Sequence, residues 1–174
     1  MRTEFGAQRT ECACKLCVLN CKVRPGALIP ADLDRMIPKW ADDNPDEKHD
    51  LLTWAESNLL ASPGAIVSKD GELFRISSLV PATREDGSCI NLTADGRCSI
   101  HETAPFGCAF FDCKSDPRDQ TLMRATLNAT WEALADSSTL YAVIWEHLWK
   151  MGRRQDGPEI LSGVYQVRMS NRRW

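Results

Sequence analysis

The sequence contains no hydrophobic run long enough to cross a membrane. Its longest apolar stretch, LYAVIWEHLW at 140–149, is interrupted by charge and falls short of the roughly 20 apolar residues that a bilayer requires. The opening residues, MRTEFGAQRT, lack the apolar segment of a signal peptide. From these absences we expect no membrane association and a cytoplasmic protein.

An excess of positive charge is also missing. The chain has 21 Lys and Arg residues against 24 Asp and Glu residues, which gives a formal net charge of −3 at pH 7. Because nucleic-acid binding usually depends on a basic surface, this balance predicts no nucleic-acid partner. The arginines of the segment 153–174 are expected to lie in a solvated tail.

The usual signs of an enzyme are absent as well. The sequence has no glycine-rich cofactor loop, no C-x3-C-x2-C radical motif, and no combination of serine, histidine and acid that stands out for nucleophilic catalysis. The sequence therefore favours a metal-binding module over an enzyme, and we predict no catalytic residue.

Cysteine, in contrast, is abundant and clustered. The eight cysteines fall into two groups of four, one near the start of the chain and one far downstream. The first group is Cys12, Cys14, Cys17 and Cys21, and the second is Cys89, Cys98, Cys108 and Cys113. Metal binding holds cysteine as thiolate, and closely spaced cysteines can direct several sulfurs at one point. We predict that all eight are metal ligands.

Four interpretations of these cysteines compete. Disulfides need an oxidising compartment, which nothing in the sequence indicates. Ordinary buried cysteines would explain one or two positions but not two groups. Zinc sites are often built from paired C-x2-C knuckles, and only Cys14 and Cys17 form one. Iron–sulfur clusters accept more varied spacing, and Phe106, Phe110 and Phe111 would supply an apolar shell.

The spacing and the aromatic residues favour iron–sulfur over zinc. Two groups of four thiols are sufficient for one or two 4Fe–4S clusters, for one cluster with one zinc, or for two zinc ions. The first hypothesis is a redox or electron-transfer module with a redox or protein partner that remains to be identified. The second is a zinc-stabilised structural or interaction domain, and the third is a cluster-dependent protein methylating enzyme.

The cysteine pattern resembles a known family. CKLCVLNC at 14–21 and CINLTADGRCSIHETAPFGCAFFDC at 89–113 are similar to the YkgJ-type cysteine-cluster proteins, which are zinc- or iron-chelating domains. The resemblance implies metal ligation by Cys14, Cys17 and Cys21 and by the four cysteines of the second group. Cys12 has no counterpart in the family pattern, and His101 stands where the family usually has tyrosine. One branch of the family resembles flagellin lysine N-methylases, which are longer proteins.

We expect a single small α+β domain over 1–174, with cysteine-rich loops and short β-hairpins around the metal centre or centres. The metal-binding region covers 11–113, starting with a loop at 11–30. A short helix at 30–40, limited by Pro38, and a helix at 46–60 follow. Asp-Gly turns predict hairpins around Asp70-Gly71 and Asp95-Gly96. An antiparallel pair of helices at 116–152 braces this region, and a tail covers 153–174.

Overall fold

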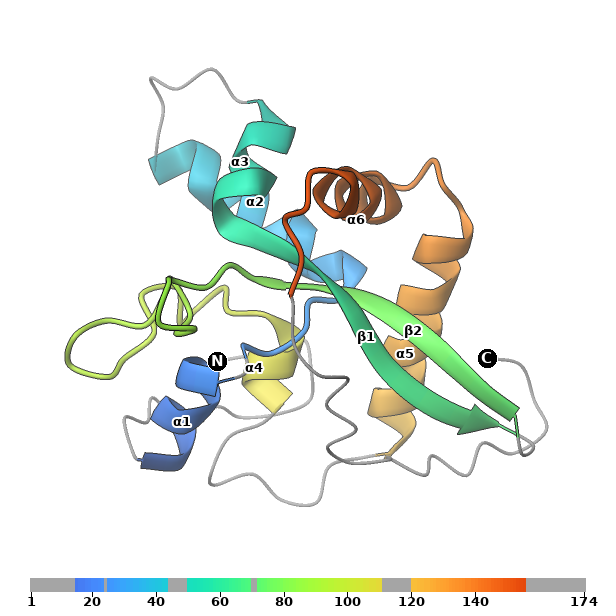
Figure 1. Ribbon diagram of the computed structural model, residues 1–174, viewed down its shortest axis with the longest axis horizontal. Helices are drawn as coiled ribbons and strands as arrows, with labels where there is room; N and C mark the ends of the chain where they lie inside the picture. The colour runs from blue at the N-terminus through green and yellow to red at the C-terminus, as the bar shows by residue number, and fades with distance from the viewer. Residues whose placement is uncertain (1–14, 24, 44–49, 70–71, 111–119, 156–174) are drawn as a thin grey trace.

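The computed structural model describes residues 15–23, 25–43, 50–69, 72–110 and 120–155 (Figure 1). Within these ranges the chain forms a small α+β structure with six helices and one two-stranded antiparallel sheet. The helices are α1 (Lys15–Val23), α2 (Pro30–Asp43), α3 (Leu51–Asn58), α4 (Phe106–Phe110), α5 (Gln120–Ala135) and α6 (Leu140–Lys150). The strands are β1 (Leu59–Lys69) and β2 (Glu72–Pro81). The predicted fold class is confirmed.

The hairpin predicted from Asp70-Gly71 is confirmed by the strand register, which pairs Lys69 with Glu72. The register shifts between Ser62 and Ala65, so Pro63 and Gly64 form an irregularity in β1. Gly64 has a φ of 75°, and a Cβ built on it would lie 1.8 Å from the carbonyl oxygen of Ile76. Glycine therefore allows this bend by both its backbone conformation and its lack of a side chain.

Three predicted segments differ from the structure. The loop expected at 11–30 contains the helix α1 at Lys15–Val23, while 11–14 lie outside the described residues. Pro38 does not end α2, which continues to Asp43. The helix expected at 46–60 is α3, which Asp50 caps through a bond from the Leu52 N–H, and Leu59 already belongs to β1. For α2, packing of Leu33 and Met36 in the core outweighs the local signal of Pro38.

The second predicted hairpin is only partly formed. Leu92 and Cys98 form a single antiparallel bridge, and Thr83 and Cys89 form another. The main chain between them turns repeatedly, and Gly96 has a φ of 80° as the Asp-Gly signal predicts. The segment 82–105 is thus a loop held by bridges instead of a ribbon.

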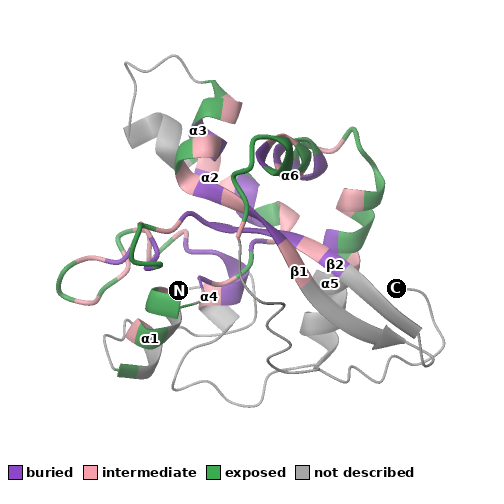
Figure 2. Cartoon of the chain, viewed as in Figure 1, coloured by how far each residue is buried: buried purple, intermediate pink, exposed green. Residues whose placement is uncertain are grey.

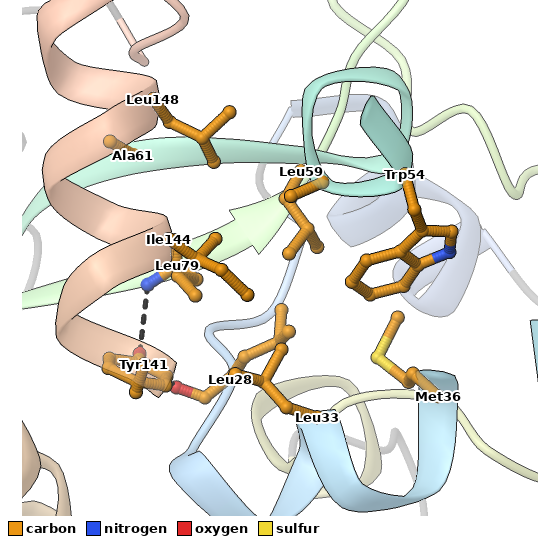
Figure 3. Packing of buried hydrophobic residues seen from close by; sticks show 11 residues of the cluster. Leu28, Leu33, Met36, Trp54, Leu59, Ala61, Leu79, Tyr141, Ile144 and Leu148 are labelled. Carbon is orange, nitrogen blue, oxygen red and sulfur yellow. Dashed lines mark hydrogen bonds between the residues drawn. The ribbon is translucent and has the colours of Figure 1, made fainter. Parts of the chain in front are cut away.

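The core lies where α2, α3, β1, β2 and α6 meet, and Figure 2 shows the buried residues concentrated there. Its members are apolar side chains from all five elements and the segment before α2 (Figure 3): Leu28, Leu33, Met36, Trp54, Ala55, Leu59, Ala61, Leu79, Tyr141, Ile144 and Leu148. Burial of this apolar surface is the main stabilising contribution to the fold.

Tyr141 joins three parts of this core through its hydroxyl group. The hydroxyl donates to the carbonyl of Leu28 over 2.7 Å and accepts from the N–H of Leu79 over 2.9 Å (Figure 3). Leu28 in turn donates its N–H to the carbonyl of Leu79 over 2.8 Å. Burial raises the pKa of Tyr141 well above its ordinary value, because the phenolate would lose its hydration. The segment after α1 is therefore fixed to β2 and α6.

The two predicted C-terminal helices are confirmed as α5 and α6, which pack against β2 and β1 respectively. Thr139 caps α6 by accepting from the N–H of Ala142. In Figure 1, α6 is seen along its axis whereas α5 runs down the page, so the helices cross and the expected antiparallel arrangement is wrong.

Only the first residues of the tail are described. Arg154 forms a parallel bridge with Ala61, so the chain after α6 extends along the free edge of β1. The rest of the tail, 156–174, lies outside the described residues. None of the helices in the described ranges has both the length and the apolar character that a membrane crossing requires.

Candidate metal centre

The structure describes the side chains of four of the eight predicted ligands. Cys21 lies in α1, Cys89 and Cys98 lie in the 82–105 loop, and Cys108 lies in α4. Cys17 is in α1 one helical turn before Cys21, but its side chain is not described. Cys12, Cys14 and Cys113 lie outside the described residues. Figure 1 shows α1, α4 and the loop at one side of the molecule.

Cys21 and Cys89 connect the two cysteine groups directly. The main-chain N–H of Cys89 donates to the carbonyl of Cys21 over 2.7 Å, which fixes the loop against α1. The Cys89 residue is buried, with 5% of its surface exposed. Residues from the two ends of the cysteine-rich region therefore lie side by side in the fold.

The environment of the Cys89 thiol suits a neutral group when no metal is bound. Burial raises its pKa from 9.0 to about 11, because the thiolate would lose its hydration. The nearby thiols of Cys21 and Cys98 raise the pKa further, while hydrogen bonds with Asn91 oppose the shift. A cation bound here would reverse this balance, since thiolates are stabilised by a positive charge beside them.

Cys98 is placed by the turn that precedes it. Its bridge with Leu92 closes the turn, and the Thr93 hydroxyl accepts from the N–H of Arg97 over 3.0 Å. The same hydroxyl donates to Asp95 over 2.6 Å, and this bond lowers the pKa of the Asp95 carboxyl. The turn is therefore held by its own polar side chains, which agrees with the Asp-Gly signal in the sequence.

Cys108 is placed by a close crossing of two backbone segments. The N–H of Gly26 donates to the Cys108 Sγ over 3.2 Å, and the N–H of Gly107 donates to the carbonyl of Ala27 over 2.9 Å. A Cβ on Gly26 would lie 2.1 Å from the main-chain nitrogen of Cys108, and one on Gly107 would lie 2.4 Å from the nitrogen of Ala27. Only glycine fits at either position.

A buried carboxylate strengthens this crossing. Asp32, near the start of α2, is fully buried and accepts from the N–H groups of Ile29 and Phe106, each over 2.8 Å. Arg35 pairs with the same carboxylate. Because Phe106 begins α4, Asp32 ties the helix that carries Cys108 to α2.

The described side chains do not close a metal cage by themselves. No three His, Cys, Asp or Glu side chains among them gather closely enough to hold a metal ion. Cys21, Cys89, Cys98 and Cys108 also form no disulfide with one another. His101, which stands where the resembled family usually has tyrosine, is half-buried in the same loop.

Sequence reasoning missed three residues that shape this region: Gly26, Gly107 and Asp32. Gly26 and Gly107 each stand close to a proline, which indicated only turns. Asp32 carried a weak signal, since acids are favoured in the first turn of a helix. Its contact with Phe106 spans 74 positions and leaves no local trace.

Comparison with known proteins adds no assignment, because no protein-family model, curated protein or solved structure gives a significant match to this chain.

The chemistry of the described donors fits a soft metal centre. Sulfur is the ligand that iron–sulfur clusters and structural zinc share, and the Cys21 and Cys98 thiols both act on Cys89. The Gly26 N–H that points at the Cys108 Sγ is the kind of donor that stabilises a ligating thiolate. The Gly26 N–H therefore favours a Cys108 thiolate. The Cys89 thiolate would need the positive charge of a bound metal to offset its burial and the nearby thiols.

Proposed function

We propose that the protein binds metal through its two four-cysteine groups and holds one or two 4Fe–4S clusters with a redox role. The observation that supports this most is the meeting of the two groups at Cys21 and Cys89. Ligands of one metal centre must lie close together, and these two cysteines come from groups that are far apart in the sequence. The resemblance to the YkgJ-type cysteine-cluster proteins supports the same proposal.

The ligands in this proposal are Cys12, Cys14, Cys17 and Cys21 with Cys89, Cys98, Cys108 and Cys113. Cys21 and Cys89 share one centre in this proposal, because the main-chain bond between them brings the two cysteine groups together. A bound 4Fe–4S cluster takes up and returns one electron at a time. The protein residues hold the cluster, limit its contact with water and supply N–H donors to its sulfurs.

Burial and N–H donors set the redox character in this proposal. Cys89 is buried, which keeps water from one side of the centre, and Gly26 donates to the sulfur of Cys108. Hydrogen bonds to ligand sulfur stabilise the reduced, more negative state of a cluster, whereas exclusion of water disfavours it. The proposal includes a cytoplasmic location, because thiolate ligands need a compartment that keeps cysteine reduced.

Anaerobic purification followed by iron, zinc and acid-labile sulfide analysis tests the proposal. We expect a brown protein that absorbs near 400 nm, contains roughly four or eight irons per chain with matching sulfide, and bleaches reversibly on reduction. Colourless protein with stoichiometric zinc and no sulfide would support the zinc-stabilised interaction domain instead. Ser99→Ala is a suitable control, since Ser99 is an exposed residue of the same loop.

A further inference from the structure

Arg84 makes an unusual set of contacts at the start of the cysteine loop. Its Nη1 donates to the carbonyl of Cys89 over 2.8 Å and to the Ser88 hydroxyl over 3.2 Å. Its Nη2 donates to the carbonyls of Ile90 and Leu92, over 2.7 and 2.8 Å. One guanidinium therefore gathers three carbonyl oxygens that lie within four successive residues.

We propose that Arg84 is a positioning residue that sets the backbone around Cys89 and Cys98 for metal ligation. The three carbonyls point toward one guanidinium, and without a cation between them their partial negative charges would repel. All acceptors that Arg84 binds among the described residues are neutral. Its hydrogen bonds thus shape the loop, while its charge also helps to lower the pKa of the nearby Asp86 carboxyl.

The geometry of the group explains why arginine is needed. A guanidinium is planar and offers five N–H donors in a fixed fork, so it can satisfy several acceptors around its edge. A lysine ammonium has one nitrogen at the end of a flexible chain and cannot reach all three carbonyls in this arrangement. Arg84→Lys therefore keeps the charge and removes the fork.

The contacts of Arg84 extend to both cysteines of the loop. The Cys89 residue is held on two sides, because its N–H donates to Cys21 and its carbonyl accepts from Arg84. Leu92, whose carbonyl is the last acceptor, forms the bridge with Cys98. Loss of the guanidinium should free the carbonyls of Cys89 and Leu92 together. It should leave Cys108 in place, because the N–H of Gly26 holds that residue.

The importance of this positioning for metal rests on the proposed function, whereas the positioning itself can be measured without metal. In the reduced, metal-free protein, the rate at which iodoacetamide alkylates each cysteine can be followed by peptide mass spectrometry. We expect Arg84→Lys to increase alkylation of Cys89 about tenfold and leave Cys108 within twofold of wild type. The matched control is Arg97→Lys, the same change at an exposed arginine of this loop that pairs with Asp95.

A second measurement covers the case in which Arg84→Lys does not fold. In the wild-type protein, the amides of Cys89 and Ile90 donate to Cys21 and Ala82, and we expect both to exchange with deuterium at least tenfold more slowly than Glu85, which is exposed. The proposal is overturned if these amides exchange as fast as Glu85. It is also overturned if a folded Arg84→Lys protein shows unchanged alkylation of Cys89.

The metal content separates this proposal from the proposed function. If wild-type protein binds no iron or zinc while Arg84→Lys still exposes Cys89, the metal function fails and the positioning role stands. If wild-type protein binds metal and Arg84→Lys retains all of it with Cys89 still protected, the positioning role fails and the metal function stands.

Discussion

The main-chain N–H of Cys89 lies 2.7 Å from the carbonyl oxygen of Cys21, and this bond links two residues from opposite ends of the cysteine-rich region. α1 carries Cys21, while the loop after β2 carries Cys89. The described cysteines of the two groups thus lie at one side of the molecule (Figure 1). The following predictions test how this arrangement is held and what it binds.

The crossing of Gly26 with Cys108 predicts a large effect of a single methyl group. In Gly26→Ala the new Cβ would lie 2.1 Å from the nitrogen of Cys108, so the two segments must separate. Overpacking of this kind lowers the free energy of unfolding by about 1–3 kcal/mol. We expect a loss near the upper end of this range, measured by urea unfolding.

Gly152→Ala is the matched control for that change. Gly152 has a positive φ of 72°, which Gly26 does not, but a Cβ there would meet no atom within 4 Å. We expect a loss of only about 1 kcal/mol, from backbone strain alone. Equal losses in the two variants would show that the close crossing contributes nothing.

The buried Asp32 carboxylate should contribute more to stability than the exposed Asp34 carboxylate on the same helix. Asp32→Asn keeps the shape but removes the charge that Arg35 and the Phe106 N–H face, and we expect it to destabilise the protein by about 3 kcal/mol. Asp34→Asn, at an exposed position, should change stability by less than about 0.5 kcal/mol. Faster alkylation of Cys108 in Asp32→Asn would confirm that α4 has loosened, and an unchanged rate would contradict it.

The hydroxyl of Tyr141 should contribute measurably to stability. Tyr141→Phe leaves the buried Leu79 N–H and Leu28 carbonyl without this partner, and each such loss costs about 1–3 kcal/mol. We therefore expect a total loss of about 2–4 kcal/mol in denaturant unfolding. A loss as small as that of Ser57→Ala, which removes an exposed hydroxyl, would contradict this role.

The raised pKa of Cys89 predicts a loss of stability at high pH in the reduced, metal-free protein. Below pH 9 the Cys89 thiol is protonated in both the folded and the unfolded state, so its ionisation does not reduce the free energy of unfolding. Between pH 9 and the folded pKa of about 11, the unfolded state ionises first, and the folded state loses about 2–3 kcal/mol of stability.

Cys89→Ser isolates this effect, because serine does not ionise in the same range. The loss between pH 9 and pH 11 should be smaller in the variant by about 2–3 kcal/mol. Tyr141, whose pKa is also raised, adds a loss above pH 10 that both proteins share. Parallel pH profiles for wild type and variant would mean that the Cys89 thiol is not shielded from water.

The sequence predicts those features of the fold that neighbouring residues determine, and it fails for features that depend on contacts between distant residues. The turn between β1 and β2 was predicted, because Asp70-Gly71 is a strong local hairpin signal. The path of α2 through Pro38 was not, since Leu33 and Met36 secure that helix by packing in the core. The low helix propensity of proline is overridden where burial of neighbouring apolar side chains stabilises the helix by more than proline costs.

The candidate site shows the same division. Sequence spacing identified the cysteines, and the structure joins Cys21 and Cys89 through a main-chain hydrogen bond. The residues that hold them in place, such as Asp32 and Arg84, were missed. Asp32 and Arg84 bind main-chain groups. Every residue has such groups, so these bonds require no particular partner residue and produce no recognisable sequence pattern.

The most direct test of a shared centre is the iron and acid-labile sulfide content of Cys21→Ala, Cys89→Ala and the double variant, each purified anaerobically beside wild type. If Cys21 and Cys89 ligate one cluster, each single variant loses about four irons with their sulfide, and the double variant loses no more than either. Losses that add in the double variant, or full iron content in either single variant, would contradict a centre built from both cysteine groups.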